Sequence, residues 1–185
     1  GPLAFNPGGG AFFAHADQTG PGTHSLTQTI FVPASSSVTL TFDMFMNDFS
    51  GGANPLVDPI GLDHTGPANQ HARIDILTAA ATPFSTAPAD IVTSILAPVP
   101  APAISGGINP WISSPVFDLT AFLGGGGAFQ IRFAETDNLG NLTLGVDNVS
   151  ILATVVPEPS TLSLAAFGAL GLIGIARRRR KRQAA

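Results

Sequence analysis

One aspartate interrupts the apolar alternation near the end of the body of the chain. In residues 141–152 (NLTLGVDNVSIL), apolar side chains occupy positions 142, 144 and 146 and then 149 and 151, so the alternation shifts by one at Asp147. Such a shift turns every later side chain of a strand to the opposite face, and something must absorb it. One solution is a β-bulge. The other is an inward-pointing Asp147 that ligates a buried cation, since a buried carboxylate needs a partner and hard oxygen ligands suit Ca²⁺.

The four histidines, His15, His24, His64 and His71, specify no metal site by their spacing. A transition-metal site needs two or three such side chains to converge, and histidines in loops are more often simply solvated. The chain has no cysteine, which excludes disulfides, thiolate metal sites and cysteine nucleophiles.

Residues 47–71 form a long segment rich in Gly, Pro, Asn and Asp, and a segment of this kind is usually functional or disordered. Its carboxylates, Asp48, Asp58 and Asp63, do not have the spacing of an EF-hand loop.

Three other acids, Asp43, Asp75 and Glu135, lie on or beside expected strands. Two convergent carboxylates could hydrolyse a glycosidic bond. We favour the alternative, in which these acids belong to polar strand faces and pair with Arg73 and Arg132.

The single tryptophan, Trp111, follows Pro110 after a Gly-rich segment. If it is exposed, it could stack on a sugar ring. We favour the alternative, in which the indole packs over an edge of the core.

The elements that must position these residues are strands. Residues 38–46 (VTLTFDMFM) alternate with period 2, which predicts a strand with one buried face. Further strands are predicted at 25–32, 72–77, 115–119, 128–135 and 141–152, with a hairpin loop at 136–141. Before residue 160 no segment has a helical period. We therefore predict an all-β fold, a jelly-roll-like antiparallel β-sandwich followed by one C-terminal hydrophobic helix.

The second half of this strand set resembles a known family. Residues 114–125 (SPVFDLTAFLGG) and 131–152 (IRFAETDNLGNLTLGVDNVSIL) are similar to the C-terminal half of galactose-binding-like jelly-roll domains. In many members an aspartate of the final strand helps to hold a structural Ca²⁺. The resemblance implies this role for Asp147, within VDNV.

The charge is distributed unevenly along the chain. Residues 1–156 carry two basic side chains against eleven acidic ones, whereas six basic side chains follow in the tail. An acidic body argues against nucleic acid as a partner, because nucleic-acid binding needs a basic face.

The tail has the features of a membrane segment. Residues 161–176 carry no charge and would span about 24 Å as a helix, somewhat less than a bilayer core of about 30 Å. Six cations follow at once, Arg177, Arg178, Arg179, Arg180, Lys181 and Arg182, and they are typical of a stop-transfer end held in the cytoplasm. The alternative is a helix that does not span a membrane and ends in a solvated basic cluster.

The whole C-terminal pattern resembles the PEP-CTERM sorting signal. Its triplet is Pro157, Glu158 and Pro159, and the apolar stretch and the basic cluster follow in that order. The resemblance implies an exported protein of a Gram-negative bacterium whose tail is recognised at the triplet and cut nearby by an exosortase. Such proteins accompany extracellular polysaccharide production. The two prolines keep the triplet extended and accessible.

These observations predict four parts: a β-sandwich domain (1–153), a linker with the triplet (154–160), a transmembrane helix (161–176) and a basic cytoplasmic tail (177–185). We expect export across the inner membrane, transient anchoring, and a final place on the outer surface or outside the cell. Two functions remain open. One is a non-enzymatic surface or matrix protein associated with exopolysaccharide or biofilm, and the other is a secreted carbohydrate-active enzyme of the glycoside-hydrolase type.

Overall fold

The computed structural model of the protein describes residues 13–16, 20–34, 36–49, 61–99, 109–155, 167 and 169–170. Nine strands and one helical turn make up this part of the chain. They are β1 (Ala14–Ala16), β2 (Gly22–Val32), β3 (Ser36–Asp48), β4 (His71–Thr78), β5 (Ile91–Val99), β6 (Ile112–Ser113), β7 (Phe117–Asp118), α1 (Thr120–Leu123), β8 (Gly127–Asp137) and β9 (Leu142–Val155).

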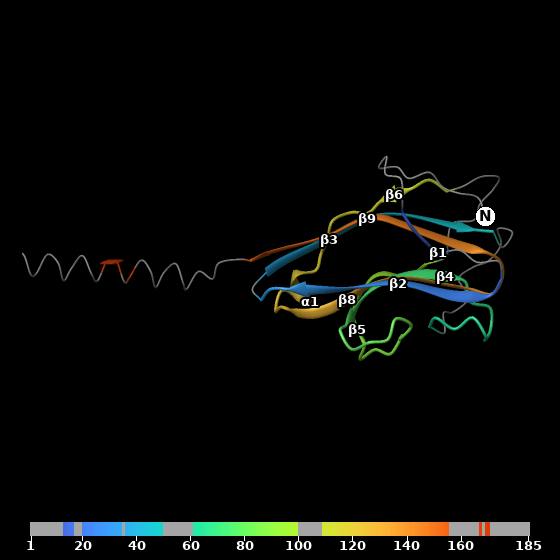
Figure 1. Ribbon diagram of the computed structural model, residues 1–185, viewed down its shortest axis with the longest axis horizontal. Coiled ribbons are helices and arrows are strands. Elements are labelled where there is room, and N and C mark those ends of the chain that lie inside the picture. Colours follow the sequence, from blue (N-terminus) through green and yellow to red (C-terminus); the bar gives the residue numbers. More distant parts are fainter. Residues whose placement is uncertain are drawn as a thin grey trace, which may run out of the picture.

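Two antiparallel sheets pack face to face (Figure 1). Sheet A has the order β1-β9-β3-β6, with β7 also paired to β3, and sheet B has the order β2-β8-β4-β5. The chain crosses between the sheets from β2 to β3, from β3 to β4 and from β8 to β9, as it does in a jelly roll. This arrangement confirms the predicted fold class.

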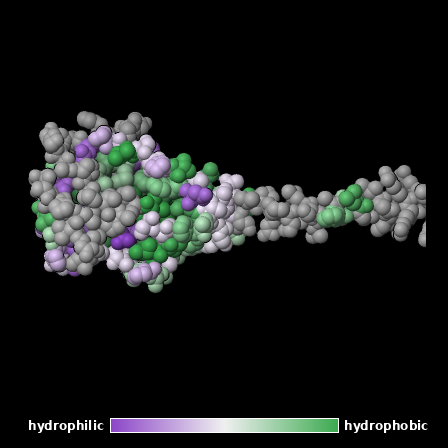
Figure 2. All heavy atoms as spheres, turned by 180° about the vertical axis from the view of Figure 1, so that it is seen from behind, coloured by the Kyte–Doolittle hydropathy of each residue, from purple (hydrophilic) through white to green (hydrophobic). Residues whose placement is uncertain are grey.

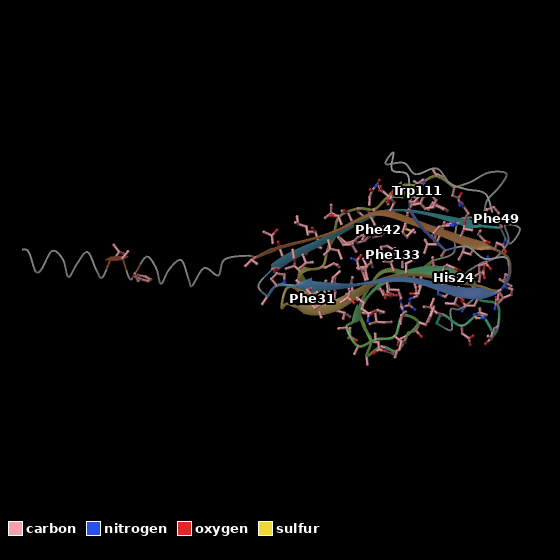
Figure 3. All side chains as sticks on the ribbon, in the orientation of Figure 1. His24, Phe31, Phe42, Phe49, Trp111 and Phe133 are labelled. Atoms are coloured by element: carbon pink, nitrogen blue, oxygen red, sulfur yellow. The ribbon has the colours of Figure 1, made fainter. Side chains whose placement is uncertain are left out.

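The core lies between the sheets and follows the predicted alternation of β3. Val38, Leu40, Phe42 and Met44 all point inward and are buried. These side chains contact the apolar face of β4 and β8 in sheet B. There Phe133 packs edge-on against Phe42, at 5.3 Å between ring centroids. Figure 3 shows these two rings between the layers.

The strand set differs from the sequence-based expectation in several places, and the short strands β1 and β6 are among the elements that were not predicted. Strand β5 was not predicted, because its alternation is weak and Pro98 lies within it. The expected strand at 115–119 contains only the two residues of β7. It is followed by the single turn α1, which is too short to give a helical period.

The predicted C-terminal helix falls almost entirely outside the described residues. Of residues 161–176, only Phe167, Ala169 and Leu170 are described, and they are helical. Within the described part of the chain, no helix has the length and apolar composition to cross a bilayer.

Candidate functional site

A groove opens between the sheets along the edge formed by β1 and β2, and we call it the edge groove. Strand β1 pairs with β9 only from Leu144 to Val146. Beyond Val146, β9 pairs with β3 alone among the described strands. Among the described residues, the short length of β1 therefore leaves the space between the sheets open at this edge.

The edge groove has a volume of about 150 Å³ and a mainly apolar lining. Leu26, Ile131 and Phe133 contribute from sheet B, and Val146 and Val149 contribute from β9. Ala14, Thr27 and Gln28 complete the lining, and none of the lining residues is titratable. Apolar walls with a few polar groups are typical of small-ligand sites, although this groove is smaller than most of them.

The phase shift noted in the sequence lies at one end of this groove as a β-bulge. The register runs from Thr41 opposite Ser150 to Asp43 opposite Asp147, so two residues of β9 lie opposite Phe42 alone. Asn148 takes the left-handed conformation, with φ at 50°. Asparagine tolerates this conformation better than most residues, and the bulge alternative is confirmed.

Hydrogen bonds from Asn148 join the two carboxylates beside the bulge. Its side-chain amide donates to Asp43 Oδ2 at 2.7 Å, and its backbone N–H donates to Asp147 Oδ1 at 2.8 Å. The hydrogen bonds from Asn148 and Ser113 hold the pKa of Asp43 below its ordinary value, because they favour the ionised form.

Asp147 faces away from the core. It follows the buried Val146 in the strand and lies opposite Asp43, whose neighbour Met44 points inward. The inward orientation that the sequence offered as one alternative is therefore wrong. The carboxylates of Asp147 and Asp43 are hard oxygen donors that fit Ca²⁺, but they supply fewer than the six to eight oxygens that Ca²⁺ takes, so water would have to supply the rest. The Ca²⁺ ligand role of Asp147 stays a prediction.

Glu135 is fully buried and its partner is a histidine. It shares a face of sheet B with Ala72 of the core, and its Oε1 lies 2.6 Å from Nδ1 of the half-exposed His24. The expected ion pair of Glu135 with an arginine is not formed, because both arginines point to the opposite face of the sheet.

Asp75 is the centre of a buried ion cluster on that opposite face. Arg73 donates to both carboxylate oxygens, at 2.7 and 2.9 Å, and Arg132 donates through Nε at 3.1 Å and through a second nitrogen. Burial alone would raise the pKa of Asp75, but hydrogen bonds from Arg73, Arg132 and Ser94 outweigh burial and hold it below its ordinary value. The predicted pairing with both arginines is confirmed for Asp75.

A loop of residues 79–90 covers this cluster. The Arg132 guanidinium donates to the backbone carbonyls of Pro83 at 3.1 Å and Ser85 at 2.6 Å. The charges of Asp75 and Arg132 are therefore enclosed by structure and are not available to a ligand.

The histidines lie in four different environments. His15 packs against Phe13, His24 contacts Glu135, and Nδ1 of His64 lies 3.2 Å from Thr23 Oγ1. His71 is fully buried, with Nδ1 at 2.8 Å from Asn69 Oδ1, and burial followed by the charge of Arg73 lowers its pKa to about 4. The part of the chain that the structure describes contains no group of three or more His, Asp or Glu side chains able to hold a metal ion.

The loop carboxylates have local partners. Gln70 donates to Asp48 Oδ1 at 2.6 Å, and the hydroxyl and backbone N–H of Thr65 donate to Asp63. Asp58 lies outside the described residues.

Trp111 packs against the outer side of sheet A, as Figure 3 shows. Its ring lies 4.8 Å from that of Phe45 and 5.3 Å from that of Phe13. Phe45 is buried on the face that the sequence assigned to polar residues, directly over Gly145, where a Cβ would lie 1.9 Å from the ring. The packing alternative for Trp111 is therefore confirmed.

The residues predicted for sorting, Pro157, Glu158 and Pro159, lie outside the described residues, and so do Arg177 to Arg180, Lys181 and Arg182. The sequence did not indicate the edge groove. Its lining comes from four strands that are far apart in the chain, and no local pattern marks it.

Comparison with solved structures finds weak likeness to carbohydrate-binding modules. The structure described as TmCBM61 in complex with beta-1,4-galactotriose gives a TM-score of 0.44 at 11% identity, over 78% of this chain and 72% of that one. One described as "CBM4 structure and function" gives 0.42 at 12%, over 83% and 89%. The fold assignment therefore rests on the strand topology itself. A search of curated proteins gave no match.

One family model matches the tail. Residues 155–181 match the model described as the PEP-CTERM protein-sorting motif. The match includes the triplet, the apolar stretch and most of the basic cluster. This chain carries a PEP-CTERM sorting motif directly after a β-sandwich and is thereby marked for export and sorting to the cell surface.

Proposed function

We propose that this chain is a non-enzymatic protein of the cell surface or extracellular matrix of a Gram-negative bacterium, and that its sandwich binds extracellular polysaccharide. The observation that carries the proposal is where the sorting motif begins. The match starts at residue 155, and β9 ends at Val155. A cut near Pro157–Pro159 would remove the tail and leave every strand of the sandwich in place.

The tail acts as a transient anchor in this proposal. Residues 161–176 would lie in the inner membrane, and the six cations that follow would remain in the cytoplasm. The sandwich would then lie on the outer side, where an exosortase recognises the triplet and releases the mature protein. The final place of the protein is the outer surface or the space outside the cell.

The edge groove is the proposed place of polysaccharide contact. Leu26, Ile131 and Phe133 provide an apolar surface, while Thr27 and Gln28 bring polar groups to the rim. Sugar rings have both apolar faces and hydroxyl groups, and this combination suits them. A biofilm or exopolysaccharide matrix would supply such chains.

Two of the strand carboxylates, Asp43 and Asp75, argue against a role as the acid of a glycoside hydrolase. A glycoside hydrolase needs one carboxyl with a raised pKa that donates a proton to the leaving group. Asp43 and Asp75 have lowered pKa values. The groove itself is lined by no acid. The carbohydrate-active enzyme remains the alternative, and release of reducing sugar from a polysaccharide by the purified protein would establish it.

Processing is tested by mass spectrometry of the protein from cells that export it. The mature form should lack residues 161–185, because the cut lies near the triplet. The Glu158→Ala variant should stay membrane-bound and uncut, while Asp63→Ala, which removes an exposed acid far from the tail, should be processed normally. An extracellular product that retains residues 161–185 would contradict the sorting proposal.

Binding is tested on a glycan array with the mature protein. Val149→Arg places a long charged side chain into the edge groove and should lower binding about tenfold or more, the equivalent of about 1.4 kcal/mol. The matched control is Leu152→Arg on the opposite face of the same strand, which should bind as the unchanged protein does. Equal binding by both variants would remove the groove from the proposal.

A further inference from the structure

Exposed hydrophobic side chains gather at one end of the sandwich, which we call the tail-proximal end. It is defined by Phe31 on β2, Phe122 on α1, and Leu152 and Val155 on β9. Phe31 is 80% exposed and Phe122 is 51% exposed. Figure 2 shows hydrophobic residues at the surface of the sandwich, interspersed with more polar ones.

The pairing of the strands places these side chains at one end. Val155 lies opposite Ser36 at the start of β3, and Ser36 N–H donates to the carbonyl of Gly124, just after α1. Phe31 lies opposite Ala128 near the start of β8. Figures 1 and 3, which share one orientation, place α1 and Phe31 at the same end as the last residues of β9.

The segments that meet at this end carry no charged side chain. Residues 29–39, 120–131 and 150–155 contain neither acidic nor basic residues, although the body has eleven acids. Asp118, which lies opposite Thr39, is the nearest acid in sequence to α1. A surface with exposed aromatic rings and with Asp118 as its nearest acid is suited to the boundary of a bilayer, whereas the more acidic remainder would be repelled by anionic lipids.

The linker between the sandwich and the apolar stretch is short. Only residues 156–160 separate Val155 from the uncharged stretch that begins at 161. Five residues reach at most about 18 Å when fully extended. The end of the sandwich that lies nearest to the membrane is therefore the tail-proximal end.

We propose that the tail-proximal end rests on the lipid bilayer while the chain is anchored, with Phe31 and Phe122 inserted among the headgroups. This inference depends on the membrane anchor of the proposed function. Such contact would hold the sandwich in one orientation, and it would keep the linker with the triplet close to the membrane surface, where a membrane enzyme can reach it.

The absence of cysteine makes a direct test possible, because one introduced cysteine can carry an environment-sensitive dye. The full chain is reconstituted into vesicles of phosphatidylethanolamine and phosphatidylglycerol that contain quencher-labelled acyl chains. The test variants are Phe31→Cys and Phe122→Cys. Phe84→Cys, at a ring of similar exposure (52%) on the 79–90 loop, is the matched control, and Leu170→Cys reports insertion of the tail.

We expect the dyes at 31 and 122 to be quenched on the order of threefold more than the dye at 84, because only the former reach the boundary between the headgroups and the acyl chains. Quenching at 170 without greater quenching at 31 and 122 than at 84 would overturn this inference and leave the anchor intact. That outcome would favour a protein, such as the processing enzyme, as the partner of this end. An unquenched dye at 170 would overturn the anchor and this inference with it.

Discussion

The loop-covered face of sheet B and the edge groove differ in how they use charge. On the covered face, Asp75 and two arginines form a buried ion cluster beneath residues 79–90. The edge groove is lined without a titratable residue. Both regions include β8, whose alternate side chains point to one region or the other.

This difference in charge suggests different roles for the two regions, with the covered face stabilising the fold and the edge groove binding ligands. The charged groups of the cluster are hydrogen-bonded to one another and to the backbone of the 79–90 loop, which they hold against the sheet. They are therefore not available to bind a ligand. The groove is open because the described β1 is short, although Ile131, Phe133 and Val146 of its lining also belong to the core. Substitutions on the covered face should therefore act on folding, and substitutions at the open edge should act on ligands or ions.

The largest effect is expected for Asp75→Asn. This change leaves two buried guanidinium groups without their carboxylate and should lower the free energy of unfolding by about 3–5 kcal/mol. Urea unfolding followed by circular dichroism measures it. Asp63→Asn, at an exposed loop acid, is the control and should change little. A small loss at Asp75 would mean that the cluster is not the element that stabilises the covered face.

A smaller effect on the same face should depend on pH. The pKa of the buried His71 is lowered from its ordinary value of 6.5 to about 4, so the unfolded chain takes up the proton first as the pH falls. The stability that the protein gains by burying a neutral His71 is fully present above pH 6.5. It is lost as the pH falls from about 6.5 to 4. The full loss, reached below pH 4, amounts to about 3 kcal/mol.

The measurement compares unfolding of the protein and of His71→Gln at pH 7.5 and 4.5. The variant should lose less stability than the unchanged protein over this interval, since glutamine does not titrate. Parallel losses in both proteins would show that other groups cause the acid sensitivity.

At the open edge, the prediction concerns Ca²⁺. If Asp147 and Asp43 hold the ion, it stabilises the folded state by about 2.7 kcal/mol when its concentration is a hundred times its dissociation constant. Thermal unfolding should then occur at lower temperature in EDTA than in millimolar Ca²⁺, and Asp147→Asn should abolish this difference. Identical curves for the unchanged protein would leave Asp147 as a residue of the bulge only.

The smallest effect should be found at Asn148. Asn148→Ala places a residue without a side-chain amide in the left-handed conformation, which alanine tolerates less well than asparagine, and should cost about 1 kcal/mol of unfolding free energy. Asn148→Gly accepts the conformation and should cost less. Both variants lose the amide donor, so the pKa of Asp43 should rise toward its ordinary value, which NMR titration measures.

Local patterns made much of the fold predictable. The alternation at 38–46 identified the inward face of β3, and the phase shift at 147–148 located the bulge. The scarcity of basic residues in the body made Arg73 and Arg132 the available partners for the strand acids. Each of these inferences depends on residues close in sequence or on a small number of possible partners.

The edge groove could not be predicted from local sequence patterns. The groove depends on β1 being three residues long and on side chains drawn from four strands. The burial of Phe45 depends on Gly145, a hundred residues away, which leaves room for its ring. The side that Asp147 faces follows from the register with β3, and the local sequence does not contain that information.

Strand β9 has a mechanical consequence. It lies along β3 from Leu142 to Val155, with one bulge, and it leads directly into the tail. A pull on the tail therefore enters the sandwich along the axis of β9, and the hydrogen bonds to β3 share the load because they lie across the direction of force. Val149, in the groove, is on the same strand. Tension between a polymer held at Val149 and the tail would be carried by residues 149–155 of β9 and by their hydrogen bonds to β3.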